Sequence, residues 1–163
     1  MKYMLTAILY FAITFQGLSP ANPYRDITMN KNWAARVADR MRVERIEKLL
    51  ATIRKVESDG RYHIRGSSGE YGAYQFQRAT WHLYSYMYEG KVLDIRVPEN
   101  QDRIARMKVT DLVGKGYSDS EIAAFWNSGI SEGWESRTGI NRWGVKFDTP
   151  AYVDKFMRVY DNG

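Results

Sequence analysis

The chain of 163 residues contains no cysteine and two histidines, His63 and His82. Without cysteine it can form neither a disulfide framework nor a thiolate metal site. The two histidines do not have the spacing of metal ligands, so we expect no metal and no cofactor. Each is interpreted as a surface or packing residue, although contact between His63 and a substrate stays open.

Long hydrophobic runs are also scarce. An apolar run of about a dozen residues, from Met4 to Phe15, follows Lys2, and it is short for a membrane span. Together with the small residues that end at Ala21, it predicts a signal peptide over residues 1–21. An uncleaved anchor is the alternative, and it would be the chain's one link to a membrane. Either way we expect one domain, 22–163, outside the cytoplasmic membrane, in the periplasm, in the cell wall or outside the cell.

Basic residues outnumber acidic ones without forming a cluster. Twenty-four lysines and arginines against nineteen acidic residues give a net charge of +5. The densest basic stretch, residues 36–45, is interleaved with Asp39 and Glu44. A nucleic-acid partner is therefore not expected. The excess charge favours attraction to another polyanion, or serves solubility alone.

The most informative helical pattern leads to a carboxylate. Ile46, Leu49, Leu50 and Ile53 follow the i, i+3, i+4, i+7 spacing of one apolar helix face. Continued at about 100° per residue, this spacing puts Glu57 in the middle of the same face. A carboxylate there is costly unless it is paired or has a chemical role.

The residues after Glu57 leave two interpretations open. Asp59 and Gly60 end the helix, so Glu57 lies where a buried face opens into a loop. Partial desolvation at such a place raises the pKa of a carboxyl towards neutrality and suits it to general acid catalysis. In the alternative, Glu57 is a structural residue in an ion pair, and its candidate partners are Arg54, Arg61 and Arg65.

The rest of the chain predicts a compact, mostly helical domain. Proline at first helical positions, a capping box from Ser118 to Glu121 and a terminating Gly129 mark helix ends. A short hairpin between residues 61–64 and 71–76 is the main strand prediction. The expected helices cover about 33–57, 77–88, 98–114, 118–127 and 149–160, with a short helix within 130–147.

Several blocks resemble the lytic transglycosylases and their lysozyme-like relatives. Glu57-Ser58 is similar to the family's helix-ending Glu-Ser, and residues 72–75 (GAYQ) to its Gly-Leu-Met-Gln. Residues 125–129 (FWNSG) resemble its Tyr-Asn-Ala-Gly block, and residues 148–153 (DTPAYV) its closing Glu-Thr-x-x-Tyr-Val. Residues 76–81 (FQRATW) resemble the resuscitation-promoting factors. The likeness spans about residues 45–160.

The resemblance implies a lysozyme-like (α+β) fold, with a small or absent β-hairpin beside the active-site groove. It implies an enzyme that cleaves peptidoglycan glycan strands, with Glu57 as acid and then base, and a 1,6-anhydro sugar as product. Recruitment by a larger envelope-spanning machine is compatible with so small a chain. Two other functions stay open: a goose-type-lysozyme-like hydrolase, whose second carboxylate would be Asp59 or Glu70, and a glycan-binding module without activity.

The resemblance also implies substrate-binding residues. Gln75, Ser67 and Ser68 would hydrogen-bond the substrate's N-acetyl group or orient Glu57. Where many relatives have serine, this chain has Gly66. Asn127 would either hold a sugar or cap its helix. Tyr152 would either hydrogen-bond Glu57 or the N-acetyl group, or pack in the core. Asp148 is explained by helix capping as well as by catalysis. The remaining expected contacts are aromatic: Tyr74, Phe76 and Trp126.

Overall fold

The computed structural model describes residues 23–140, 144 and 146–163. The predicted signal peptide therefore lies outside the described residues. The chain divides into two compact units, Met1–Met41 and Arg42–Gly163, and the core and the pockets belong to the second. Within the described ranges, no helix combines the length and the apolar character that crossing a membrane requires.

The protein is mostly helical, as predicted, with a single two-stranded sheet in the described residues. The first helix of the described residues, α2, begins at Pro23 rather than near Trp33. The helix continues through Asn30 and Asn32, so neither marks its start. The elements are α2 (Pro23–Ser58), α3 (Arg78–Glu89), α4 (Pro98–Gly114), α5 (Asp119–Ser128), the 3-10 helix η1 (Trp134–Ser136), β1 (Thr138–Ile140), β2 (Lys146–Asp148) and α6 (Thr149–Asn162).

The predicted helix ends are confirmed where the signal is local. Ser118 and Glu121 form the capping box at the start of α5. Gly129 ends α5 in a left-handed conformation with φ of 75°, which glycine adopts without a steric penalty. Asp148 caps α6, since its carboxylate accepts a 2.9 Å hydrogen bond from the backbone N–H of Ala151.

The hairpin predicted at 61–64 and 71–76 is reduced to an isolated antiparallel bridge between Arg65 and Tyr71, beside a 2.9 Å hydrogen bond from the Gly72 N–H to the carbonyl of Ile64. The two-stranded sheet of the described residues is β1 with β2, in which Thr138 is opposite Asp148. Residues 71–76 fold back on themselves, because Tyr71 and Phe76 exchange two backbone hydrogen bonds of 3.0 Å. Gly72 and Gln75 both take positive φ angles inside this turn, which breaks the extended run that a strand needs.

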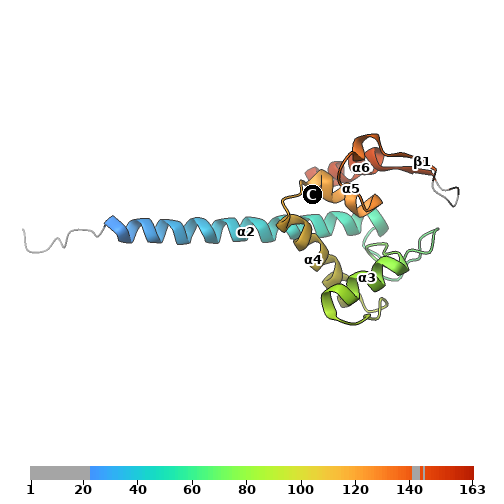
Figure 1. Cartoon of the computed structure of the whole chain (residues 1–163), viewed down its shortest axis with the longest axis horizontal. Coiled ribbons are helices and arrows are strands. Elements are labelled where there is room, and N and C mark those ends of the chain that lie inside the picture. The colour runs from blue at the N-terminus through green and yellow to red at the C-terminus, as the bar shows by residue number, and fades with distance from the viewer. Residues whose placement is uncertain (1–22, 141–143, 145) are drawn as a thin grey trace, which may run out of the picture. The chain divides into compact units, whose positions relative to one another are not determined.

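The core of the second unit forms around the C-terminal part of α2. Figure 1 shows α5 and α6 on one side of this segment and α3 and α4 on the other. Leu49 and Ile53 of α2 are fully buried against Ile104 of α4 and Ile122 of α5. The apolar face predicted from the helical spacing is therefore the face that forms the core.

A buried glutamine attaches the 61–76 loop to this core. Gln101 of α4 is completely buried. Its side chain accepts a 2.8 Å hydrogen bond from the backbone N–H of Ala73 and donates to the carbonyls of Tyr62 and Ile95, at 3.0 and 2.7 Å. All the polar atoms of the amide group thus have partners, and these hydrogen bonds fix the loop to α4.

Candidate active site

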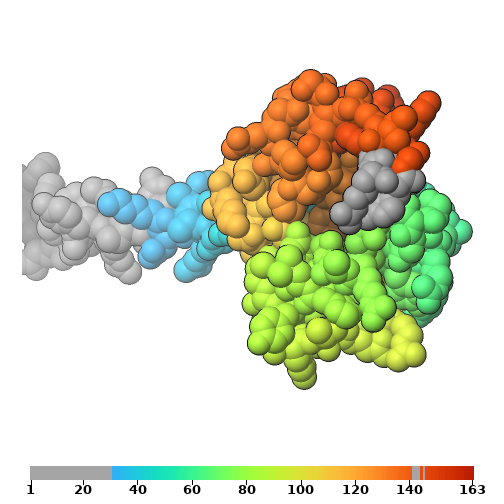
Figure 2. Space-filling view, turned by 45° about the vertical axis from the view of Figure 1, so that its right-hand side comes forward, coloured from blue at the N-terminus to red at the C-terminus, as the bar shows by residue number. Residues whose placement is uncertain are grey.

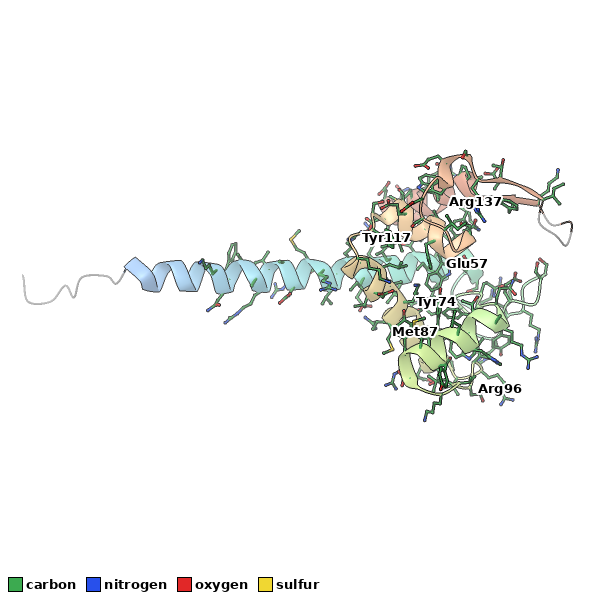
Figure 3. The ribbon with its side chains drawn as sticks, in the orientation of Figure 1. Glu57, Tyr74, Met87, Arg96, Tyr117 and Arg137 are labelled. Atoms are coloured by element: carbon green, nitrogen blue, oxygen red, sulfur yellow. The ribbon has the colours of Figure 1, made fainter. Side chains whose placement is uncertain are left out.

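Glu57 lies in the last turn of α2, where the helix opens into the loop. Figure 3 shows it between the α5–α6 side and the α3 side of the domain. The neighbouring Ser58 is buried, and its hydroxyl donates a 2.8 Å hydrogen bond to the carbonyl of Ala73, which joins the helix end to the loop. The pocket at this point is lined by Glu57, Gly66, Ser67, Glu70, Gln75, Gln77, Trp126 and Asn127.

The pKa of Glu57 is raised from 4.5 to about 7. Burial is the largest cause, because desolvation disfavours the charged carboxylate, and the nearby charge of Glu70 adds to it. Two groups act in the opposite direction. The Tyr152 hydroxyl donates a 2.5 Å hydrogen bond to Glu57 Oε1, and Lys155 contributes its positive charge. The carboxyl can therefore exchange a proton near neutral pH.

The three arginines proposed as structural partners of Glu57 all make other contacts. Arg54 donates to the Tyr74 hydroxyl at 2.9 Å and to Asp102 at 3.1 Å. Arg61 donates to the backbone carbonyl of Ser58, and Arg65 lies over the ring of Tyr71. Within the described residues, no arginine forms an ion pair with Glu57. The geometry thus fits the chemical interpretation of Glu57 better than the structural one.

Gln75 lies beside Glu57 in a constrained conformation. Its backbone has a φ of 49°, and its side-chain N–H donates a 2.7 Å hydrogen bond to the carbonyl of Gly72. Gly66 approaches the same side chain so closely that an added Cβ would lie 2.5 Å from Gln75 Oε1 and would also meet Glu70 Oε2. This crowding explains why glycine stands at the position where the resemblance leads one to expect serine.

The two serines of the loop have different surroundings. Ser67 lines the Glu57 pocket, whereas Ser68 is not among its lining residues. The backbone N–H of Ser68 donates a 3.0 Å hydrogen bond to Glu70 Oε2. Gln77 holds the other oxygen of Glu70 through a 2.7 Å hydrogen bond. Glu70 is therefore a fixed second carboxylate in the pocket, while Asp59 is fully exposed and paired with Lys55 outside it.

Trp126 and Asn127 bring the end of α5 to the pocket. The indole N–H of Trp126 donates a 3.3 Å hydrogen bond to the carbonyl of Tyr74, and its ring packs 5.6 Å from that of Phe76. Gly129, not Asn127, is the C-cap of α5, and the side-chain Oδ1 of Asn127 accepts a 3.1 Å hydrogen bond from the Thr149 hydroxyl. This bond joins α5 to the start of α6.

Tyr74 and Phe76 are core residues in this structure. The Tyr74 side chain is completely buried, and its hydroxyl donates to Asp102 at 2.7 Å while accepting from Arg54. Burial and the adjacent Asp102 carboxylate raise the pKa of Tyr74 far above its usual range. Phe76 is 4% exposed. Both residues line the neighbouring pocket, but the Tyr74 hydroxyl is already hydrogen-bonded to Asp102 and Arg54.

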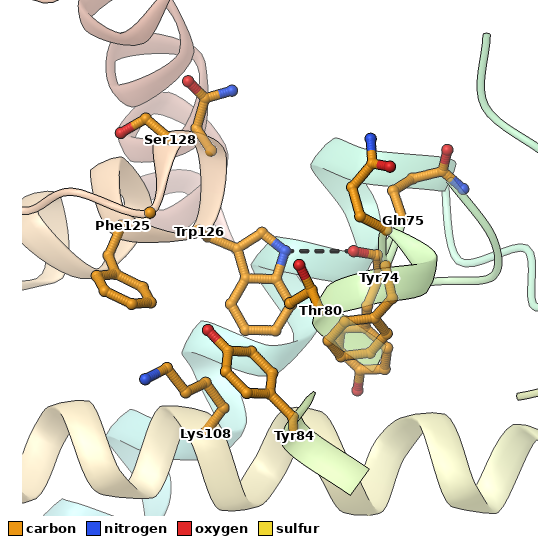
Figure 4. A pocket seen from close by; sticks show the side chains of 12 residues that line it. Tyr74, Gln75, Thr80, Tyr84, Lys108, Phe125, Trp126 and Ser128 are labelled. Carbon is orange, nitrogen blue, oxygen red and sulfur yellow. Dashed lines mark hydrogen bonds between the residues drawn. The ribbon is translucent and has the colours of Figure 1, made fainter. Parts of the chain in front are cut away.

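A second pocket of about 290 Å³ adjoins the first and shares Gln75, Gln77, Trp126 and Asn127 with it. In the space-filling view, α3 in light green and the orange region of α5 form the facing sides of this part of the molecule (Figure 2). Figure 4 shows Trp126 between the Gln75 side and the side where Lys108 lies. The two pockets therefore adjoin, and together they are called the groove below.

Lys108 was not identified from the sequence, although a signal for it exists. It lies between Ile104 and Leu112 at the i, i+4, i+8 positions of α4, and all three are buried. The same reasoning that identified Glu57, a charge on an apolar helix face, applies to it. Among the described residues, no group of three acidic, histidine or cysteine side chains has the arrangement of a metal site.

Comparisons with protein-family models, with curated proteins and with solved structures found no significant match to this chain.

Proposed function

We propose that this protein is a peptidoglycan lytic transglycosylase and that Glu57 is its single acid and base. The observation that carries the proposal is a buried carboxyl, Glu57, that lines a pocket and whose pKa burial raises to about 7. A group with this pKa is well matched to giving and taking one proton at neutral pH. The ordered sequence blocks around Glu57, Gln75, Asn127 and Tyr152 support the same family.

In the proposed reaction, Glu57 first protonates the glycosidic oxygen between N-acetylmuramic acid and N-acetylglucosamine. The bond from that oxygen to C1 breaks, and the positive charge that develops at C1 is stabilised by the substrate's own N-acetyl oxygen. The muramic C6 hydroxyl then attacks C1, and its proton passes to the Glu57 carboxylate. The product is a 1,6-anhydro sugar, no water is consumed, and Glu57 is protonated again.

The neighbouring residues have distinct parts in this scheme. Tyr152 orients the Glu57 carboxyl through its 2.5 Å hydrogen bond. Gln75 is held by Gly72, so it presents its oxygen in one direction, where it can accept from the N–H of the N-acetyl group. Trp126 supplies an apolar ring face on which a sugar packs well.

Glu70 supports a second candidate, a hydrolase on the same scaffold. Glycosidases that add water commonly use a second carboxylate to activate it. Glu70 lines the Glu57 pocket and is fixed by Gln77 and the backbone of Ser68. A Glu70→Gln variant separates the two candidates, because it should abolish hydrolysis but leave a transglycosylase able to cleave.

The decisive experiment compares wild-type protein with Glu57→Gln on purified peptidoglycan. We expect wild type to clear the peptidoglycan in a zymogram and Glu57→Gln to lose clearing while it keeps its circular dichroism spectrum. Soluble products should be lighter by one water than hydrolysed fragments and should carry no label from heavy-oxygen water. Equal clearing by both proteins would exclude Glu57 as the acid, and label at the new end would indicate the hydrolase. No clearing by wild type would favour the glycan-binding module.

A further inference from the structure

The groove beyond Trp126 contains a charge that the proposed reaction does not use. Among the described residues that line this pocket, Lys108 is the one with a charged side chain. Polar groups also reach it, from Gln77, Thr80 and Ser128. The pocket shares four lining residues with the Glu57 site, so the two adjoin and a glycan of several sugars bound in one can reach the other.

Lys108 is about nine-tenths buried, since 9% of its side chain is exposed. Its ammonium lies 4.4 Å from the ring centre of Phe125 and 5.1 Å from that of Tyr84, so two aromatic faces surround it (Figure 4). Such faces stabilise a cation, but they replace only part of the water that it has lost. Burial accordingly lowers the pKa of Lys108.

The one carboxylate paired with Lys108 is shared. Within the described ion pairs, Asp111 Oδ2 lies 3.5 Å from the Lys108 ammonium and 2.9 Å from that of Lys115. Two ammonium groups thus face one carboxylate, and the closer one is the exposed Lys115, with 58% of its side chain accessible. The cluster keeps one net positive charge, which is directed at the pocket by the buried Lys108.

We propose that Lys108 is a specificity-determining residue that binds a carboxylate of the glycan substrate in this pocket. The inference rests on the proposed function, because the substrate class is taken from it. A single buried ammonium matches a single negative charge. A carboxylate in the pocket would accept a strong hydrogen bond from Lys108, as Asp111 accepts one of 2.9 Å from Lys115. The carboxylate is either the lactyl group of muramic acid or a group on the attached peptide.

The test measures binding without turnover, in a Glu57→Gln background, by isothermal titration calorimetry. The probes are three tetrasaccharides of the peptidoglycan repeat: one with free lactyl carboxylates, one with these converted to methylamides, and one with peptides attached. We expect at least one carboxylate-bearing probe to bind about tenfold more tightly than the methylamide. Tight binding of the free acid identifies the lactyl carboxylate as the ligand, and tight binding of the peptide form alone identifies the peptide.

Lys108→Met should remove this preference, because methionine keeps the length and apolar stem but not the charge. Lys115→Met is the matched control, since Lys115 shares Asp111 but lies outside the pocket, and it should retain the preference. If Lys108→Met does not fold, Asp111→Asn supplies the second test. It removes the competing carboxylate and should increase the preference.

The inference is overturned if no carboxylate probe binds better than the methylamide. It is also overturned if Lys108→Met leaves the preference unchanged. Where Lys108→Met does not fold, an unchanged preference in Asp111→Asn overturns it. This outcome is distinguishable from failure of the proposed function. Peptidoglycan clearing by wild type, together with equal binding of all probes, overturns the role of Lys108 alone. Absence of clearing overturns the transglycosylase, whereas a carboxylate preference that depends on Lys108 would still identify the groove as a site for acidic glycans.

Discussion

The hydroxyl of Tyr152 donates a 2.5 Å hydrogen bond to Oε1 of Glu57, although the two residues are 95 positions apart in the chain. Burial raises the pKa of Glu57, and this bond together with Lys155 opposes the rise. The pKa of about 7 is the net effect of desolvation, which raises it, and of hydrogen bonding to the charged form, which lowers it. The contribution of the hydrogen bond can be removed by one substitution, so its effect on the pKa can be tested.

The hydrogen bond itself is tested by Tyr152→Phe. Loss of the donor should raise the pKa of Glu57 further, so the decline of kcat/KM above pH 7 should move to higher pH. We also expect activity at the optimum to fall by about 10- to 100-fold, because the carboxyl loses its orientation. The measurement is the pH profile of peptidoglycan solubilisation, with Tyr86→Phe, an exposed tyrosine, as the control. An unchanged pH limb would show that Tyr152 does not act on the carboxyl.

The raised pKa of Glu57 also predicts how stability depends on pH. Between pH 4.5 and about 7 the folded state keeps a proton that the unfolded state has released, so the free energy of unfolding should fall as pH rises. The contribution of this one group is about 3 kcal/mol, fully present below pH 4.5 and lost above pH 7. It should be absent from Glu57→Gln.

Urea unfolding of wild type and Glu57→Gln at several pH values between 4 and 8 measures this difference directly. Subtracting the free energy of unfolding of Glu57→Gln from that of wild type at each pH cancels the contributions of the other carboxyls, because these titrate in both proteins. Glu99→Gln, a substitution at an exposed position of α4, is the control and should retain the wild-type slope. Parallel curves for wild type and Glu57→Gln would mean that folding leaves the pKa of Glu57 near 4.5.

Gly66→Ala tests whether the absence of a side chain at position 66 matters for the site. The added Cβ would press on Gln75 and Glu70, whose side chains would have to move. A displacement of about 1 Å in a positioning residue can cost roughly 100-fold in rate, so activity should fall much more than stability. Gly114→Ala is the matched control, because its Cβ would meet only the flexible end of Arg42, at 3.2 Å. Full activity of Gly66→Ala would show that Gln75 is not a positioning residue.

Tyr74→Phe distinguishes a core role from a substrate-binding role for Tyr74. Removing its buried hydroxyl leaves Asp102 and Arg54 short of one partner, and we expect a loss of about 1–3 kcal/mol in the free energy of unfolding. Tyr62→Phe removes a 2.9 Å bond to the same Asp102 from a less buried position and should cost less. KM for both variants should match wild type. A raised KM with unchanged stability of Tyr74→Phe would restore the sequence-based interpretation.

Features that depend on neighbours in the chain could be predicted from the sequence. The capping box at Ser118, the stop at Gly129 and the cap at Asp148 involve residues within four positions of one another. The direction of Glu57 is equally local, since it follows from the period of α2. Local geometry limits each of these to one or two outcomes, so the amino-acid pattern was sufficient.

What the tertiary structure decided was which side chains meet across the fold. Sequence spacing left Asp59 and Glu70 as equal candidates for a second carboxylate, and only packing puts Glu70 in the groove. The turn of Tyr71 onto Phe76 reduced the expected hairpin to isolated bridges, and the distant Gln101 of α4 holds this turn through the backbone N–H of Ala73. Burial of Lys108 between Tyr84 and Phe125 requires three helices together. Long-range desolvation and pairing set these outcomes, and neither is encoded in any short segment of the chain.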